Sequence, residues 1–257
     1  MKMDENKVIY DCRWSSDIDS VFFNNFINTF NAIFNKCLDY SYFENKYLNN
    51  RYGESVLVIA YCNKCPVAVD ALWRNDVNGQ MSFQSVDTGV LPLYRGHGIF
   101  YGMVREKISK LKDGALVYGF PNNNSYKGFL NIGWNLQKEY WQRILFNPNA
   151  IDNNVQYPYI DEEYFKWWLN KNSANYAYVK YFGRLFIVAK RYRFPIYTIV
   201  GRCNNWVSNY LPKVRGIYML CYKSDKKCIY SGLFTVTRVI TLNNPNKMVP
   251  LWKLDAL

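Results

Sequence analysis

The chain has 257 residues, of which 49% are hydrophobic and 20% are charged, and its formal net charge at pH 7 is +12. This length is sufficient for one large domain or two modest ones, and so high an apolar content excludes an intrinsically disordered chain. Residues 1–7 are polar and no apolar run is long enough to span a bilayer, so we expect neither a signal peptide nor a transmembrane segment. These features predict a cytoplasmic protein.

Charge is unevenly distributed along the chain. Residues 1–150 hold 16 Lys and Arg against 14 Asp and Glu, whereas residues 151–257 hold 16 against 6. The positive surplus of the second part predicts attraction to an anionic partner, and an acidic saccharide, a sugar nucleotide, a membrane surface or nucleic acid would each satisfy it. Seven cysteines, an odd number without a regular framework, indicate the reduced thiols of a cytosolic protein.

Cys62 and Cys65 have the spacing of a metal-binding pair. No second pair follows at the distance of a zinc site, and the single histidine of the chain is His97. We therefore expect a tight turn between two strands here, and no bound metal.

The chain opens with the patterns of one strand and two helices. Residues 7–14 predict the strand. Apolar side chains recur every three to four residues from 18 to 34, which predicts an amphipathic helix with Asp17 or Asp19 as its N-cap. A second helix is expected over residues 39–48.

Strands and helices then alternate up to residue 146. Three strands are predicted at 55–61, 67–73 and 81–90, with turn pairs at Asn63-Lys64 and Asn78-Gly79. The elements expected after them are a helix over 98–111, a strand at 115–120, a helix over 122–131 and a strand at 136–146.

The rest of the chain is richer in strands. The polar stretch 149–158 is interpreted as a linker, and residues 161–169 predict a short helix with acidic residues in its first turn. The elements predicted beyond it are strands at 176–181, 183–190 and 196–200, a helix over 204–210, and strands at 216–222 and 229–239.

Residues 90–99 join a buried strand to a helix through a glycine-rich turn. Pro92 ends the strand because it has no backbone donor. Gly96 and Gly98 would let a phosphate approach the backbone N–H groups at the helix N-terminus, where the helix dipole adds partial positive charge. Arg95 adds a cation, so the turn predicts a cradle for a phosphate or diphosphate group.

Two sequence blocks together resemble a known family. The first, V-x-P-x-x-R-G-x-G-I, covers residues 90–99, and the second is Asn122-x-x-Ser125-x-x-x-Phe129-x-x-x-Gly133-Trp134. Their residues, order and separation resemble the GNAT superfamily of acyl-CoA-dependent N-acyltransferases, and the resemblance extends over residues 7–148. The predicted order of strand, two helices, three strands, helix, strand, helix, strand is also the arrangement of that family.

The resemblance implies an α+β (mixed α/β) fold, in which a mixed, mainly antiparallel central sheet is flanked by helices. The β-rich C-terminal extension has a strand, strand, strand, helix, strand order that would suit a degenerate second half of the same fold. We place an acetyl-CoA-binding domain at residues 1–150 and a basic domain, on the acceptor side, at 151–257. A second cofactor site is not expected, because the second part has no glycine-rich turn.

The resemblance also implies where the donor, acetyl-CoA, would bind. Its diphosphate would lie on the backbone of Arg95, Gly96, His97, Gly98, Ile99 and Phe100. Its pantetheine arm would pair with the strand end formed by Thr88, Gly89 and Val90. Further contacts would come from Asn122 and Ser125.

The sequence evidence for the catalytic acid and base is weaker than that for the donor site. Many members of the family have a tyrosine, four residues after the Ser125 position, that can protonate the leaving thiolate. Phe129 stands there in this chain, so the remaining choices are the neighbouring Tyr126, a water molecule, or no acid. Asp87, near the end of the strand at 81–90, is the candidate general base. Two further carboxylates rank after it: Glu54 and Asp70.

Two classes of function fit these features. The first is an N-acetyltransferase whose acceptor is a primary amine; similar members with an extra C-terminal part are associated with bacterial polysaccharide synthesis, which favours an amino sugar on an anionic nucleotide or lipid carrier. The second is a non-catalytic module that binds an anionic partner such as nucleic acid. It is supported by the positive surplus and the missing tyrosine, although nucleic acid is the less favoured partner.

Other assignments stay open. Transfer of an aminoacyl group to a peptidoglycan precursor lacks specific support in the sequence. Trp167 and Trp168 fit either a sugar-stacking platform or core packing, and a homodimer is left open.

Overall fold

The computed structural model describes residues 8–145, 155–181, 183–190, 196–214, 218–223, 236–242 and 249–250. The chain forms two compact units. The first consists of residues 1–119, 123–135 and 241–245, and the second of residues 120–122, 136–240 and 246–257. The sequence analysis predicts a domain boundary after residue 150.

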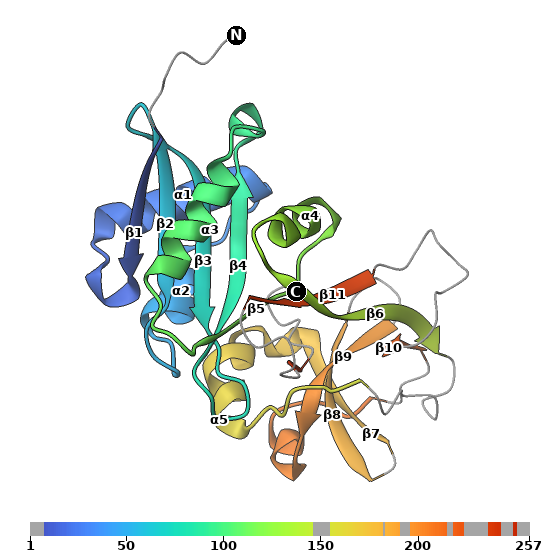
Figure 1. The fold of residues 1–257 in the computed structure, drawn as a ribbon. Helices are drawn as coiled ribbons and strands as arrows, with labels where there is room; N and C mark the ends of the chain where they lie inside the picture. Colours follow the sequence, from blue (N-terminus) through green and yellow to red (C-terminus); the bar gives the residue numbers. More distant parts are fainter. Residues whose placement is uncertain are drawn as a thin grey trace. The chain divides into compact units, whose positions relative to one another are not determined.

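The first unit is built on five strands in the order β1-β2-β3-β4-β5 (Figure 1). They are β1 (Ile9–Trp14), β2 (Val56–Cys62), β3 (Cys65–Arg74), β4 (Ser82–Val90) and β5 (Leu116–Gly119). The strands β1 to β4 are antiparallel neighbours, and β5 runs parallel to β4. The sheet is therefore mixed and mainly antiparallel, as predicted.

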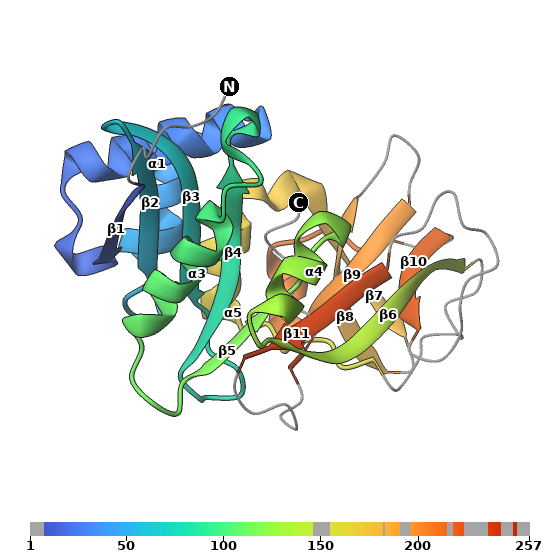
Figure 2. The ribbon, with the colours of Figure 1, turned by 45° about the horizontal axis from the view of Figure 1, so that its top comes forward.

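Helices cover both faces of this sheet. The helices α1 (Ser20–Phe34) and α2 (Tyr40–Phe43) lie on one face, and α3 (Ile99–Ser109) lies on the other (Figures 1 and 2). A π-helical turn, Glu44–Leu48, continues α2. Asp19 caps α1 by accepting a 2.7 Å hydrogen bond from the backbone N–H of Phe22. Below the cap, α1 buries the apolar side chains of Phe22, Phe23, Phe26, Ile27 and Phe30.

The two predicted turn pairs adopt the left-handed backbone that tight hairpin turns require. Asn63 and Lys64 have φ of 50° and 65°, and Asn78 and Gly79 have φ of 51° and 74°. Cys62 and Cys65 face each other across the first of these turns. Among the described residues, no group of three or more His, Cys, Asp and Glu side chains could hold a metal ion.

The helix α4 (Asn123–Asn131) follows β5 and packs on the start of α3. The Phe129 ring is buried and contacts the rings of Phe100 and Trp134 edge-on, with centroids 5.1 and 4.8 Å away. A Cβ atom at Gly128 would lie 2.9 Å from Cε1 of Phe100, so the two helices approach closely. Gly133, at φ 88°, ends the helical segment as predicted.

A buried ion pair connects α3 to the sheet. The ammonium group of Lys107 lies 2.5 Å from Oδ1 of Asp70, and both side chains are fully buried. Lys107 also donates to Oγ of Ser85 at 2.8 Å, and Oδ1 of Asp70 accepts a 2.6 Å hydrogen bond from Oγ1 of Thr88. Burial raises the pKa of Asp70 and lowers the pKa of Lys107, because each charged form has lost its water.

In the described part of the second unit, six strands follow the order β11-β6-β10-β9-β8-β7. They are β6 (Asn135–Leu145), β7 (Tyr176–Tyr181), β8 (Arg184–Lys190), β9 (Ile196–Cys203), β10 (Tyr218–Lys223) and β11 (Val236–Thr241). The strands β7, β8 and β9 are antiparallel neighbours, whereas β10 runs parallel to β9. Of the strands predicted at 216–222 and 229–239, residues 216–217 and 229–235 lie outside the described residues.

The second unit repeats the strand order of the first. In both units, three strands joined by two antiparallel pairings are followed by a helical segment and then by a strand parallel to the third. In the first unit this order is β2, β3, β4, α3 and β5. In the second unit it is β7, β8, β9, a 3-10 helix (Asn205–Asn209) and β10. The predicted α+β fold with a related β-rich extension is therefore what the structure has. No helix in the described part of the chain is both long and apolar enough to cross a bilayer.

Helical and extended segments precede β7. The helix α5 (Glu162–Tyr164) is capped by Asp161 and continues in a π-helical turn, Phe165–Leu169, and a 3-10 segment, Asn170–Asn175. Trp168 in the π-helical turn is buried, which places it in the core and not on a sugar-stacking surface.

The described end of the predicted linker 149–158 is packed. Val155 and Tyr157 are buried, and the Pro158 carbonyl accepts a 2.7 Å hydrogen bond from the backbone N–H of Arg202. Residues 149–154 of that stretch lie outside the described residues.

We predict that the two members of the buried pair depend on each other for stability. Lys107→Met should lower the free energy of unfolding by about 3–5 kcal/mol, because it leaves the Asp70 carboxyl group buried without its counter-ion. The double change Asp70→Asn with Lys107→Met should recover most of that loss. Urea denaturation of the three proteins measures both effects, and a double variant no more stable than Lys107→Met would contradict the coupling.

Candidate active site

The turn between β4 and α3 is exposed, and its glycines leave the main chain uncovered by side chains. A 3-10 turn, Pro92–Tyr94, leads to Arg95 and then to Gly96 and Gly98, which have φ of 83° and 75°. A Cβ atom at either glycine would meet nothing within 4 Å, and the His97 side chain between them is exposed. The backbone of this turn can therefore be reached by a ligand, and a side chain at either glycine would strain it.

The turn ends at the N-terminus of α3. Gly98 is the N-cap and has no side chain to satisfy the first N–H groups of the helix. The first helical hydrogen bond runs from the Gly102 N–H to the Gly98 carbonyl at 3.2 Å. The preceding N–H groups, including those of Ile99 and Phe100, point out of the helix end, where the helix dipole favours an anion.

Arg95 folds back onto the end of β4. Its Nε donates a 3.0 Å hydrogen bond to the Val90 carbonyl, and the side chain is exposed. The guanidinium group therefore lies at the junction of the strand and the turn, and contributes its positive charge there.

The strands β4 and β5 separate beside this turn. Pairing in register links residues 82–85 of β4 to Leu116–Gly119, and β5 ends there while β4 continues to Val90. On that side, residues 86–90 have no partner strand in the described part of the chain. Their backbone forms an edge that can accept an extended ligand as an added strand.

A β-bulge shapes this edge. The pairing of β3 with β4 shifts register between Val69 and Ala71, so that Asp70 faces two residues, Asp87 and Thr88. Asp87 has a left-handed backbone with φ of 54°, which is uncommon for a residue with a side chain. The ion pair of Asp70 with Lys107 fixes the bulge from the α3 side through Oγ1 of Thr88.

The predicted base, Asp87, is held from the opposite side of the sheet. Its carboxylate accepts two hydrogen bonds from Nζ of Lys46, at 3.1 and 3.0 Å, and one from the hydroxyl of Tyr47. The Lys46 side chain is fully buried and that of Asp87 is 11% exposed. The rings of Tyr42, Tyr47 and Trp73 surround the Lys46 ammonium at 5.4 to 5.9 Å, which partly replaces its lost water.

The remaining predicted residues lie on β4 and around α4. Gly89 is required by packing, since a Cβ there would lie 2.5 Å from Cγ2 of Ile33 in α1. Asn122 is exposed just before α4, and Ser125 and Tyr126 are half-buried in its first turns. Glu54 is exposed in the loop before β2, and the buried Asp70 has no route to an amine.

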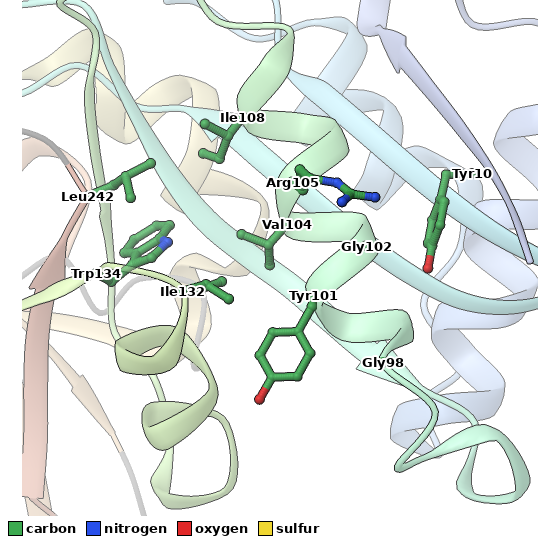
Figure 3. A pocket seen from close by; sticks show the side chains of 10 residues that line it. All are labelled: Tyr10, Gly98, Tyr101, Gly102, Val104, Arg105, Ile108, Ile132, Trp134 and Leu242. Atoms are coloured by element: carbon green, nitrogen blue, oxygen red, sulfur yellow. The ribbon is translucent and has the colours of Figure 1, made fainter.

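A groove runs along the outer side of α3 (Figure 3). It has a volume of about 580 Å³, begins at Gly98, and is bordered by Tyr101 and Arg105 of α3, Tyr10 of β1 and Trp134. Tyr10 lies directly over α3, because a Cβ at Gly102 would come within 2.0 Å of its hydroxyl oxygen. Of the residues predicted to form the anion cradle, Gly98 borders this groove.

Sequence reasoning missed several residues of this site. The sequence pattern predicts only a helix for Lys46 and Tyr47, which hold Asp87, and only a strand for Tyr10. A lysine embedded in the aromatic segment 40–48 was the available signal, because a buried ammonium requires a carboxylate partner.

In the second unit, the matching edge is occupied by the chain itself. The pairing of β9 with β10 covers Ile196, Tyr197 and Thr198 only. Further along β9, the Arg202 N–H donates to the Pro158 carbonyl at 2.7 Å, and its carbonyl accepts from the Ile160 N–H at 2.8 Å. Residues 158–160 therefore form a parallel β-bridge to β9 at Arg202.

Comparisons with known proteins bear on the fold. No family model and no curated protein matches the sequence. Among solved structures, a conserved protein of unknown function from Enterococcus faecalis, described as a probable N-acyltransferase, superposes with a TM-score of 0.56 at 12% identity, over 91% of this chain and 72% of its own.

Two GCN5-related N-acetyltransferases give similar values. The one from Anabaena variabilis has a TM-score of 0.52 at 12% identity, over 90% of this chain and 72% of its own. The one from Kribbella flavida has a TM-score of 0.51 at 11% identity, over 90% of this chain and 71% of its own. Likeness at this level of identity concerns the fold alone, and the chain has the fold of the GCN5-related N-acetyltransferases.

Proposed function

We propose that the chain is an acyl-CoA-dependent N-acyltransferase that moves an acetyl group from acetyl-CoA to a primary amine. The observation that carries the proposal is the meeting, in one unit, of a glycine turn at a helix N-terminus and a strand edge without a partner. A diphosphate suits the first and an extended, amide-bearing chain suits the second. Coenzyme A joins these two groups in one molecule.

The residues that would hold the donor are those of the turn and the edge. Backbone N–H groups from Gly96 to Phe100 would bind the diphosphate, with Arg95 adding positive charge. The backbone of Thr88, Gly89 and Val90 would pair with the pantetheine arm, and Asn122 and Ser125 would add contacts. Bound there, the thioester would supply an acyl group activated for direct attack by an amine.

Asp87 is the proposed general base. A protonated amine has to lose a proton before or during attack, and a carboxylate oxygen can accept it. The three hydrogen bonds from Lys46 and Tyr47 leave about one acceptor position on the Asp87 carboxylate. These partners also fix its orientation, which favours a defined approach of the amine.

Tyr126 is the proposed acid for the leaving sulfur. Phe129 has no proton to give, and its ring is buried between Phe100 and Trp134. Tyr126 stands one helical turn earlier on α4 and is half-buried. Its hydroxyl oxygen would carry the proton that the departing thiolate takes up.

The proposed acceptor is an amino sugar on an anionic carrier, as in the synthesis of bacterial polysaccharides. Its support is the charge of residues 151–257, which hold 16 Lys and Arg against 6 Asp and Glu. Such a surplus attracts the phosphate groups of a nucleotide or lipid carrier.

We predict that Gly98→Glu weakens acetyl-CoA binding at least about tenfold, corresponding to about 1.4 kcal/mol. The new carboxylate would occupy the N–H groups of the helix end and repel the diphosphate. Gly114→Glu is the matched control, because Gly114 also has a positive φ of 89° and nothing within 4 Å of a Cβ, but lies beyond the other end of α3. Titration calorimetry should show loss for the first variant only, and equal affinities would refute the cradle.

The role of Asp87 can be separated from its ion pair. Asp87→Asn and Lys46→Met break the same contact, but only the first removes a proton acceptor. We predict that Asp87→Asn lowers kcat by about 10²- to 10⁴-fold, while Lys46→Met lowers it by less than about tenfold, because Tyr47 still holds the carboxylate. Thiol release from acetyl-CoA, measured on folded variants, provides the rates. Equal losses in the two variants would assign Asp87 a structural role.

The acceptor class is tested by a screen with the same thiol readout. Nucleotide-linked amino sugars should be acetylated with a lower KM than the free amino sugars, because residues 151–257 would attract the phosphates. Equal KM values would contradict the proposal that the acceptor sugar is attached to an anionic carrier. DNA binding with a steep salt dependence, and no thiol release with any amine, would instead support a non-catalytic module.

A further inference from the structure

The second unit has a hollow of its own. It has a volume of about 760 Å³ and lies where the end of β9 meets the start of β8. The side chains that matter for its chemistry are Arg184, Arg202, Tyr159, Trp206, Asn204 and Asn205. Two cations, two aromatic rings and two amides therefore line one cavity.

The strand register places the two arginines on one face. Phe186 pairs with Arg202 across the antiparallel strands β8 and β9, so their side chains point to the same side. Arg184 precedes Phe186 by two residues in β8 and shares that side, since side chains alternate along a strand. Arg184 and Arg202 are thus diagonal neighbours, a relation that separates residues by about 7–8 Å. Both guanidinium groups can reach one phosphate or diphosphate group.

These two cations have no counter-ion among the described residues. Both side chains are exposed, and neither forms an ion pair there, in contrast to Lys166 with Glu162 and Arg238 with Glu139. Like charges on neighbouring positions of a strand pair repel each other. An anion bound between Arg184 and Arg202 would remove that repulsion, and guanidinium groups match phosphate oxygens with paired donors.

The aromatic residues Trp206 and Tyr159 of this hollow are suited to a flat, apolar part of a ligand. The Trp206 ring packs against the rings of Phe165 and Tyr210, with centroids 5.4 and 6.1 Å away. Tyr159 is 51% exposed, and its backbone is fixed because residues 158–160 pair with β9 at Arg202. An exposed aromatic ring on a fixed backbone, beside two arginines, is suited to stacking a base or a sugar.

We propose that this hollow binds a nucleoside diphosphate, free or as the carrier of a sugar. The diphosphate would lie on Arg184 and Arg202, and the base would stack on Tyr159 beside Trp206. The amides of Asn204 and Asn205 would donate to and accept from its polar edge. The inference does not depend on acyl transfer, and it assigns the positive charge of the second unit to a defined site.

Calorimetry with uridine diphosphate and inorganic pyrophosphate tests this site. The full-length Gly98→Glu protein is used, so that the turn before α3 does not compete for the diphosphate. Arg184→Gln and Arg202→Gln should each weaken uridine diphosphate binding at least about tenfold. Lys190→Gln is the matched control, because it removes an exposed cation from the opposite end of β8, and it should change the affinity less than about twofold.

Stacking is tested by comparing the two probes. Uridine diphosphate should bind more tightly than pyrophosphate, and Tyr159→Ala should abolish the difference while leaving pyrophosphate binding unchanged. Absence of uridine diphosphate binding at millimolar concentration would overturn the proposal. So would a loss in Lys190→Gln equal to that in the arginine variants, because the attraction would then come from diffuse charge.

Discussion

Backbone N–H and C=O groups in a folded chain need hydrogen-bond partners. In the first unit, the proposed ligand site lies where some of these groups have no partner within the described part of the chain. The strand β4 loses its neighbour β5 after Ser85, yet continues to Val90. A few residues later, the first N–H groups of α3 emerge at a turn without covering side chains. The two sets of groups lie at the two ends of one turn, which suits them to a ligand with an extended part and an anionic part.

The backbone of residues 86–90 has to hold its conformation without a neighbouring strand on one side among the described residues. Two buried ammonium groups, one on each side of the sheet, serve this purpose. Lys46 holds Asp87 at the left-handed position of the bulge, and Lys107 holds Asp70, which in turn accepts from Thr88. The second unit meets the same requirement differently, because residues 158–160 of the chain itself pair with β9. One strand order thus yields an open edge in one unit and a filled edge in the other.

The features that sequence predicted are those with local causes. Asp19 as a helix cap, the Asn63-Lys64 and Asn78-Gly79 turns, and the exposed glycine turn before α3 each depend on a few adjacent residues. The bulge at Asp87 and the partners of that carboxylate depend on contacts between distant segments. The polar composition of residues 149–158 predicts a linker, whereas Tyr157 is buried.

Residue-resolved hydrogen exchange in the presence and absence of acetyl-CoA tests the central claim most directly. If the open edge and the helix end form the donor site, acetyl-CoA should slow exchange of the amides in residues 86–90 and 96–101. Protection confined to other segments, with residues 86–101 unaffected at saturating acetyl-CoA, would contradict the account.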